Sequence, residues 1–214
     1  MSKGELDYRV RPAAGEPRGA LVLFHGRGAD EYDLEPLLHA LDPDRRLVGV
    51  LPRGPLTLPP GGAHWYVVRE IGYPDPETFH GTYTIATRLL DSLTEALDVP
   101  LTRTVIGGFS QGCVMSYALG LGAGRPSPAG IVGLSGFIPR VDGFSIDLDT
   151  RSTLPVAIGH GTGDPIIGVQ WSRDARDRLE SAGIDVVYRE SPIGHSIDPA
   201  FIPELQGWLE KIFV

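Results

Sequence analysis

The chain lacks what disulfides and membrane spans require. Cys113 is the one cysteine among 214 residues, so no intrachain disulfide can form, which fits a reducing compartment. No apolar run approaches the roughly 18 residues of a membrane span. Residues 1–10 also hold no apolar segment of the kind found in secretory signals. We therefore expect a cytoplasmic protein without integral membrane association.

Sequence patterns for metals, nucleotides and nucleic acids are also missing. There is no H-E-x-x-H, paired-cysteine or EF-hand spacing, so we expect no metal site. The run Gly26-Arg27-Gly28 starts like a dinucleotide fingerprint, but Glu31 replaces its third glycine and would repel a pyrophosphate. A formal net charge of −8 argues against nucleic acid as a partner. We expect no cofactor.

What is present alternates between two hydrophobic periods. Short apolar runs predict buried strands, and apolar residues spaced by three and four predict helices. Asp30 and Asp33 are candidate caps of the first helix. Gly183 suits the end of the fourth helix, and Pro203 suits the first turn of the fifth. The predicted strands span 20–24, 47–51, 104–107, 130–134, 154–158 and 186–188, and the predicted helices span 34–41, 79–97, 111–121, 171–182 and 205–212.

Repeated strand–helix alternation predicts an α/β fold. Its core would be a single doubly wound, mostly parallel sheet with helices on both faces. No linker divides the chain, so we expect one domain over residues 1–214. In such folds ligands bind at the carboxyl ends of the strands.

The pentapeptide Gly108-Phe109-Ser110-Gln111-Gly112 matches G-x-S-x-G between a predicted strand and a predicted helix. A turn of this kind projects the serine hydroxyl outward, and its glycines remove Cβ atoms that would clash. The pattern predicts Ser110 as the nucleophile of a serine hydrolase. The backbone N–H of Gln111, at a helix N-terminus, is then one oxyanion donor.

A serine nucleophile needs an imidazole to take its proton, and the imidazole needs a carboxylate. In α/β-hydrolases the acid and then the base follow the serine along the chain. Asp164 comes after the predicted strand 154–158, and His195 comes after the last predicted strand. Asp198 lies only three residues beyond His195 and fits the turn before the last helix better.

The other five histidines suit the role of base less well. His25 and His160 follow predicted strands but precede the acid. His39 lies in the first predicted helix. His64 and His80 fall around an irregular region, where they could touch substrate.

Residues 52–76 form a proline- and glycine-rich stretch with no clear period. Long aromatic loops of this kind are often a binding wall or partial cover. A surface excursion packed by its own side chains is equally compatible with the sequence. On the first interpretation the substrate pocket draws on Trp65, Tyr66, Ile71 and, after the acid, Ile166.

The chain resembles the phospholipase/carboxylesterase family of small α/β-hydrolases, which includes bacterial carboxylesterases and acyl-protein thioesterases. The resemblance implies the α/β-hydrolase fold, with Ser110 as nucleophile, Asp164 as acid and His195 as base. It also implies the Arg27 backbone N–H as second oxyanion donor. One departure is Gly168, where members commonly have proline, and this predicts a looser loop after the acid. The motifs that carry the resemblance are Leu23-Phe24-His25-Gly26-Arg27-Gly28-Ala29, Trp65-Tyr66, Gly108-Phe109-Ser110-Gln111-Gly112, Gly133-Leu134-Ser135-Gly136-Phe137, His160-Gly161 with Asp164, and Gly194-His195-Ser196.

The expected function is hydrolysis of small-molecule acyl esters through an acyl-enzyme, of the carboxylesterase or lysophospholipase type. The same triad would serve an acyl-protein thioesterase, and the sequence of the elbow, the pentapeptide around Ser110, does not distinguish ester from thioester hydrolysis. A non-catalytic binding module on the same scaffold is a third hypothesis. The resemblance also allows a homodimer, although no apolar stripe identifies an interface.

Overall fold

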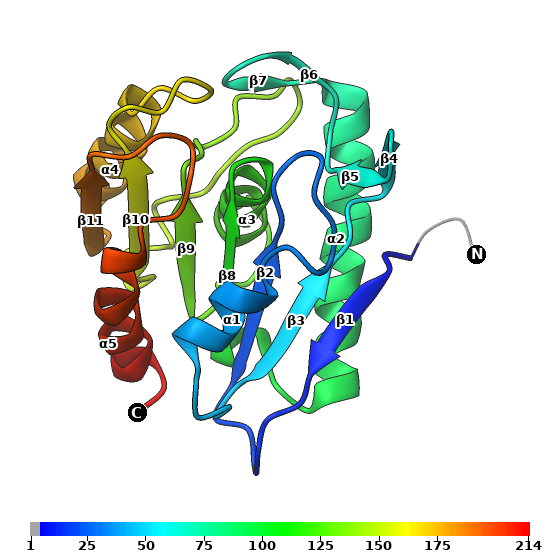
Figure 1. Cartoon of the computed structure of the whole chain (residues 1–214), viewed down its shortest axis with the longest axis vertical. Helices are drawn as coiled ribbons and strands as arrows, with labels where there is room; N and C mark the ends of the chain where they lie inside the picture. The colour runs from blue at the N-terminus through cyan, green and yellow to red at the C-terminus, as the bar shows by residue number, and fades with distance from the viewer. Residues whose placement is uncertain (1–4) are drawn as a thin grey trace.

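A seven-stranded sheet organises the protein in a computed structural model that describes residues 5–214 (Figure 1). Residues 1–4, where the segment expected to lack a secretory signal begins, lie outside the described residues. The strand order is β1-β3-β2-β8-β9-β10-β11. The bounds are β1 Tyr8–Arg11, β2 Ala20–Phe24, β3 Val48–Pro52, β8 Thr104–Phe109, β9 Gly130–Leu134, β10 Val156–Gly161 and β11 Val186–Ser191.

The sheet is parallel except at one edge, where β1 pairs with β3 in the antiparallel direction. The predicted fold class is therefore confirmed. All six predicted strands are present, with ends shifted by one to three residues in some of them. The edge strand β1 was missed because it is only four residues long and half exposed, which leaves almost no apolar period to read.

Within residues 5–214, five α-helices cover the two faces of the sheet. α1 and α5 pack on one face, while α2, α3 and α4 lie on the other (Figure 1). α3 is buried along its whole length, because it lies against the central strands under its neighbours. The bounds are α1 Glu35–Leu41, α2 Pro76–Leu97, α3 Gln111–Leu121, α4 Gln170–Ser181 and α5 Ile202–Ile212.

The prediction for the start of α1 is wrong. Its N-cap is Leu34, which offers no side-chain cap, and the Asp30 carboxylate instead accepts the Tyr32 N–H in a local turn, 3.0 Å away. The residues predicted at the end of α4 and the start of α5 lie where expected. Gly183 adopts a left-handed φ of 78° just after α4, and Pro203 lies in the first turn of α5.

Residues 52–76 are more regular than expected, since they contain two short hairpins. β4 (Leu56–Leu58) pairs with β5 (Gly62–His64), and β6 (Val68–Glu70) pairs with β7 (Tyr73–Pro74). Both lie toward the edge of the sheet where the parallel strands end (Figure 1). Strands of two or three residues are too short to show a period, which explains the miss.

Within residues 5–214, no helix has the length and apolar character to cross a bilayer.

Candidate active site

Ser110 occupies a one-residue turn between the end of β8 and the start of α3. Its backbone has φ 56° and ψ −117°, a left-handed conformation that is rare for a residue with a Cβ. Strain of this kind persists where the surroundings impose it, and it is common at active sites. The turn places the Ser110 side chain at the carboxyl edge of the sheet.

The two elbow glycines are required by contacts with the neighbouring backbone. A Cβ on Gly108 would lie 2.4 Å from the carbonyl carbon of Gly112. A Cβ on Gly112 would lie 1.8 Å from the carbonyl oxygen of Phe24, at the end of β2. The helix can therefore cross close to the sheet only because both positions lack side chains, as the sequence predicted.

Replacing Gly112 with alanine is expected to lower the free energy of unfolding by about 3 kcal/mol, because the backbone that it meets cannot move aside as a side chain could. Urea denaturation of purified protein measures this change. Gly207→Ala is the matched control, since position 207 is in the interior of α5 and a Cβ there would meet nothing within 4 Å. That control should gain up to about 1 kcal/mol. Equal stabilities of the two variants would contradict the close-crossing argument.

Three loops bring the predicted nucleophile, base and acid into one hydrogen-bonded line. His195 Nε2 lies 3.0 Å from Ser110 Oγ, and His195 Nδ1 lies 2.6 Å from Asp164 Oδ2. The loops follow β8, β10 and β11, so all three side chains meet at the same sheet edge. The His195 ring packs against Phe109 at a centroid distance of 4.8 Å. Its side chain is 18% exposed whereas that of Asp164 is fully buried, so the acid is shielded from solvent.

The Asp164 carboxylate is held in its charged form. Burial would raise its pKa, but the hydrogen bond from His195 and those from the N–H groups of Ile167 and Ile166 outweigh burial. The pKa of Asp164 therefore lies below its usual range. A carboxylate that stays ionised can fix the His195 tautomer and stabilise the imidazolium.

His160 lies beneath this carboxylate rather than at the nucleophile. Its Nε2 donates to the Ile167 carbonyl at 2.7 Å and is 3.3 Å from Asp164 Oδ2. Burial lowers the pKa of His160, so the ring is neutral, and its Nδ1 has no partner within the described residues. The bond from His160 to Ile167 and the two N–H groups that donate to Asp164 stabilise the loop after the acid. Gly168 of this loop stands where the family that the chain resembles commonly has proline.

The two expected oxyanion donors lie on either side of the elbow. The Gln111 N–H is in the first turn of α3, where helix N–H groups have no intrahelical partner. Arg27 lies in the loop after β2. Among residues 5–214, the backbone hydrogen bonds of that loop use the N–H groups of Gly28 and Ala29 and leave that of Arg27 free. The arginine side chain is exposed, and it forms no ion pair with the described residues.

The four residues predicted for the substrate pocket do not lie in one environment. Ile166 is 57% exposed beside the acid, and Ile71 is partly buried. Trp65 and Tyr66 are 0% and 2% exposed, so their side chains belong to the core. Their contact with substrate stays a prediction.

Sequence reasoning missed the side-chain roles of His25 and Gln111. His25 Nε2 accepts the Gly54 N–H at 3.0 Å, and Nδ1 donates to the Gly26 carbonyl at 2.6 Å. The Gln111 amide bonds the backbone of residues 65 and 66. A polar residue inside an otherwise apolar strand-end or helix pattern was the available signal, because a buried polar group needs partners.

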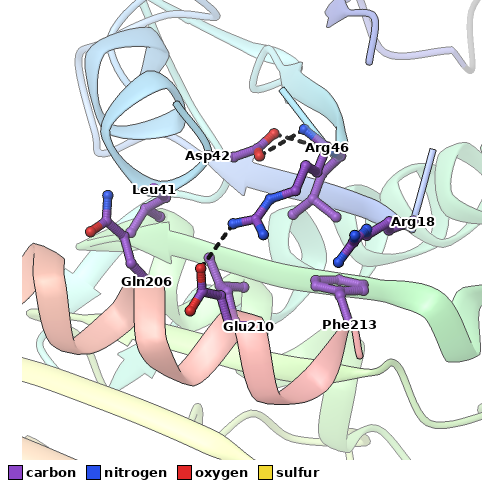
Figure 2. Close-up of a pocket in the computed structure, with 9 residues that line it drawn as sticks. Arg18, Leu41, Asp42, Arg46, Gln206, Glu210 and Phe213 are labelled. Atoms are coloured by element: carbon purple, nitrogen blue, oxygen red, sulfur yellow. Dashed lines mark hydrogen bonds and ion pairs between the residues drawn. The ribbon is translucent and has the colours of Figure 1, made fainter. Parts of the chain in front are cut away.

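A pocket between α1 and α5 lies away from this line, at the amino ends of the strands (Figure 2). Its volume is about 20 Å³, and an Arg46–Glu210 ion pair at 3.0 Å crosses it. The space is too small for a substrate. In the described part of the chain, no group of three or more His, Cys, Asp or Glu side chains could hold a metal ion.

Comparisons with known proteins agree on a family. The model of the family described as Phospholipase/Carboxylesterase matches residues 7–213. Acyl-protein thioesterase 1 of Yarrowia lipolytica is 33% identical over 155 residues, covering 69% of this chain and 67% of the relative. Acyl-protein thioesterase 1 of Gibberella zeae is 25% identical over 230 residues, covering 99% and 97%.

A solved structure, the Bacillus cereus carboxylesterase, has a similar fold. Its TM-score to this chain is 0.84 at 22% sequence identity, with 99% of this chain and 96% of that one covered. The maize acyl-protein thioesterase 2 has a TM-score of 0.74 at 24% identity, with coverages of 97% and 99%. At these identities the likeness speaks for the fold alone.

Proposed function

The chain belongs to the phospholipase/carboxylesterase family of esterase-type hydrolases, and on that premise we propose that it cleaves small-molecule acyl esters with Ser110 as nucleophile, His195 as base and Asp164 as acid. The observation that carries this proposal is the unbroken line of two hydrogen bonds, 3.0 Å and 2.6 Å long, from Ser110 Oγ through His195 to Asp164.

Acylation begins when His195 Nε2 takes the proton of the Ser110 hydroxyl and Oγ attacks the ester carbonyl. Asp164 holds the imidazole with its proton on Nδ1, so that Nε2 faces the hydroxyl as an acceptor. The resulting imidazolium then gives its proton to the leaving alcohol as the carbon–oxygen bond breaks. General acid–base catalysis of this kind contributes about 10²–10⁴-fold.

The negative charge that develops on the carbonyl oxygen needs fixed donors. The backbone N–H groups of Arg27 and Gln111 are proposed for this role. Fixed donors are effective because they need no reorganisation during the reaction, and losing one typically costs about 10²–10³-fold in rate. Water activated by His195 then attacks the acyl-serine, releases the acid and returns the proton to Ser110.

Active-site labelling tests this proposal directly. A fluorophosphonate should modify one serine per chain, on the peptide that contains Ser110, and p-nitrophenyl ester hydrolysis should fall in proportion to the label. Hydrolysis that survives complete labelling would exclude Ser110 as the nucleophile. A folded protein that neither reacts with the probe nor hydrolyses esters would support the binding module instead.

Thioester hydrolysis is the second candidate, and the names of the curated relatives favour it, since both matches above are acyl-protein thioesterases. The chemistry at Ser110 is the same for either bond. A series with one acyl chain separates them: p-nitrophenyl octanoate, octanoyl-CoA and a peptide carrying an octanoyl-cysteine. The substrate with the highest kcat/KM identifies the preferred bond and leaving group.

A further inference from the structure

Trp65 connects the 52–76 segment to the loop that follows β2. The residue comes directly after β5, and its indole is completely buried. Nε1 donates to the His25 carbonyl at 2.8 Å, and the ring packs edge-on to Phe24 at a centroid distance of 5.1 Å. The indole therefore holds the backbone two residues before Arg27, whose N–H is one of the proposed oxyanion donors.

The side chain of Gln111 bonds the same segment from the other side. Its Oε1 accepts the Trp65 N–H at 3.0 Å, and its Nε2 donates to the Tyr66 carbonyl at 2.9 Å. Gln111 is 4% exposed, so both bonds are shielded from water. Its own backbone N–H is the second proposed oxyanion donor.

The two donors are thus joined through one residue. A chain of buried hydrogen bonds runs from Gln111 to Trp65 and on to the His25 carbonyl. The Trp65 carbonyl is itself held by Thr82 Oγ1 of α2 at 2.5 Å. A second attachment of the β2 loop is the pair of bonds Gly28 N to Ala63 O and Ala63 N to Ala29 O, both 2.8 Å long.

This arrangement matters for catalysis because an oxyanion hole depends on distance. Its donors must lie about 2.7–3.1 Å from the oxygen that becomes charged. One donor lies in the loop after β2 and the other in the first turn of α3, so the sheet alone does not fix their spacing to that precision. Supporting hydrogen bonds are what hold such groups within about 0.5 Å.

We propose that Trp65 and the Gln111 side chain are positioning residues that set the spacing of the two oxyanion donors. This inference rests on the proposed function, since it needs an oxyanion to form at Ser110. Trp65 then acts on the reaction without touching the substrate.

Trp65→Phe removes the indole N–H and keeps an aromatic ring in the core, while Gln111→Met removes both amide bonds and keeps the backbone N–H. Each variant should lower kcat by about 10–10²-fold, less than the loss of a whole donor, with KM changed less than about twofold. A boronic acid that forms a tetrahedral adduct on Ser110 should bind more weakly by the same factor as kcat/KM falls.

Trp208→Phe is the matched control. Trp208 is also a buried indole, 6% exposed, but it lies on α5 across the sheet, and its N–H makes no hydrogen bond to the described residues. It should leave kcat and boronic acid affinity within about twofold of the wild type.

Parallel losses in kcat and boronic acid affinity, with KM unchanged, support the inference. A change confined to KM would overturn it and return Trp65 to the pocket wall, and unchanged kinetics would overturn it as well. If Trp65→Phe does not fold, Gln111→Met decides. Fluorophosphonate labelling of the wild type distinguishes failure of the proposed function from failure of the positioning role. If Ser110 is not labelled, the proposed function is rejected. If labelling is normal and the variants are unaffected, only the positioning role is rejected.

Discussion

Replacing Ser110 with alanine is expected to lower kcat for ester hydrolysis by about 10⁶-fold, the loss found when a triad serine is removed. The variant keeps the imidazole and both proposed oxyanion donors but has no atom to form the acyl-enzyme. A residual acceleration of about 10³–10⁴-fold over water is expected from the oxyanion hole and binding. Hydrolysis of a p-nitrophenyl ester under single-turnover conditions measures the loss, and labelling by a fluorophosphonate should disappear.

Ser135→Ala is a well-matched control for this substitution. Ser135 is 1% exposed at the end of β9, and its φ of 51° is as unusual as that of Ser110. Its hydroxyl has no hydrogen-bond partner within the described residues, so its removal breaks none. This variant should keep activity within about threefold. Comparable losses at both positions would mean that the damage comes from the backbone conformation and not from the nucleophile.

Replacing Asp164 with asparagine is expected to lower kcat by about 10⁴-fold near neutral pH. The amide nitrogen would donate to His195 Nδ1 and move the ring proton to Nε2. That proton would then face Ser110 Oγ, and the imidazole could no longer accept the hydroxyl proton. Steady-state hydrolysis at saturating ester measures the change, with circular dichroism to verify the fold.

Asp198→Asn tests whether any lost carboxylate in this region would have the same effect. Asp198 caps the short helix at Pro199–Phe201 and accepts the Ala200 N–H at 2.9 Å, and within residues 5–214 it forms no hydrogen bond with His195. Its loss should cost less than about tenfold in kcat, since it touches no reacting group. Equal losses for both variants would reject Asp164 as the residue that orients the base.

The lowered pKa of Asp164 also fixes part of the expected pH profile. A depressed carboxyl pKa keeps the charge in place as pH falls, until the pH passes below the ordinary aspartate value of about 3.9. Any loss of wild-type activity between about pH 4 and neutrality should therefore not come from protonation of Asp164, and the pH profile of kcat for ester hydrolysis measures this.

The order of elements and the three residues of the proposed triad could be identified from sequence because both leave strong local signals. Buried parallel strands are continuous apolar runs, and the G-x-S-x-G pentapeptide spans the point where β8 ends and α3 begins. The chain order Ser110, Asp164, His195 then restricted the choice of base among six histidines. Edge strand β1 and the two hairpins left no such signal, because half-exposed strands of two to four residues carry too few positions for a period.

The 52–76 segment shows where sequence reasoning stops. Composition could mark its aromatic residues, but it could not tell an exposed wall from a buried anchor. That difference is decided by partners far apart in the chain, such as Gln111, 46 positions from Trp65. Partners also decide the role of Asp30. The sequence predicted a helix cap, but its carboxylate accepts the Tyr32 N–H in a local turn.

The contacts of the 52–76 segment divide it into parts that tolerate insertions and substitutions to different degrees. Insertions around Trp65 would disturb the hydrogen bonds that join this segment to His25 and Gln111. Gly62 has no room for a side chain, since a Cβ there would lie 2.1 Å from the Gly28 carbonyl oxygen. One residue earlier, at the tip of the β4–β5 hairpin, Gly61 has nothing within 4 Å of such an atom. A library that varies length and chemistry at this tip should therefore leave the hydrogen bonds of Trp65 and Gln111 intact.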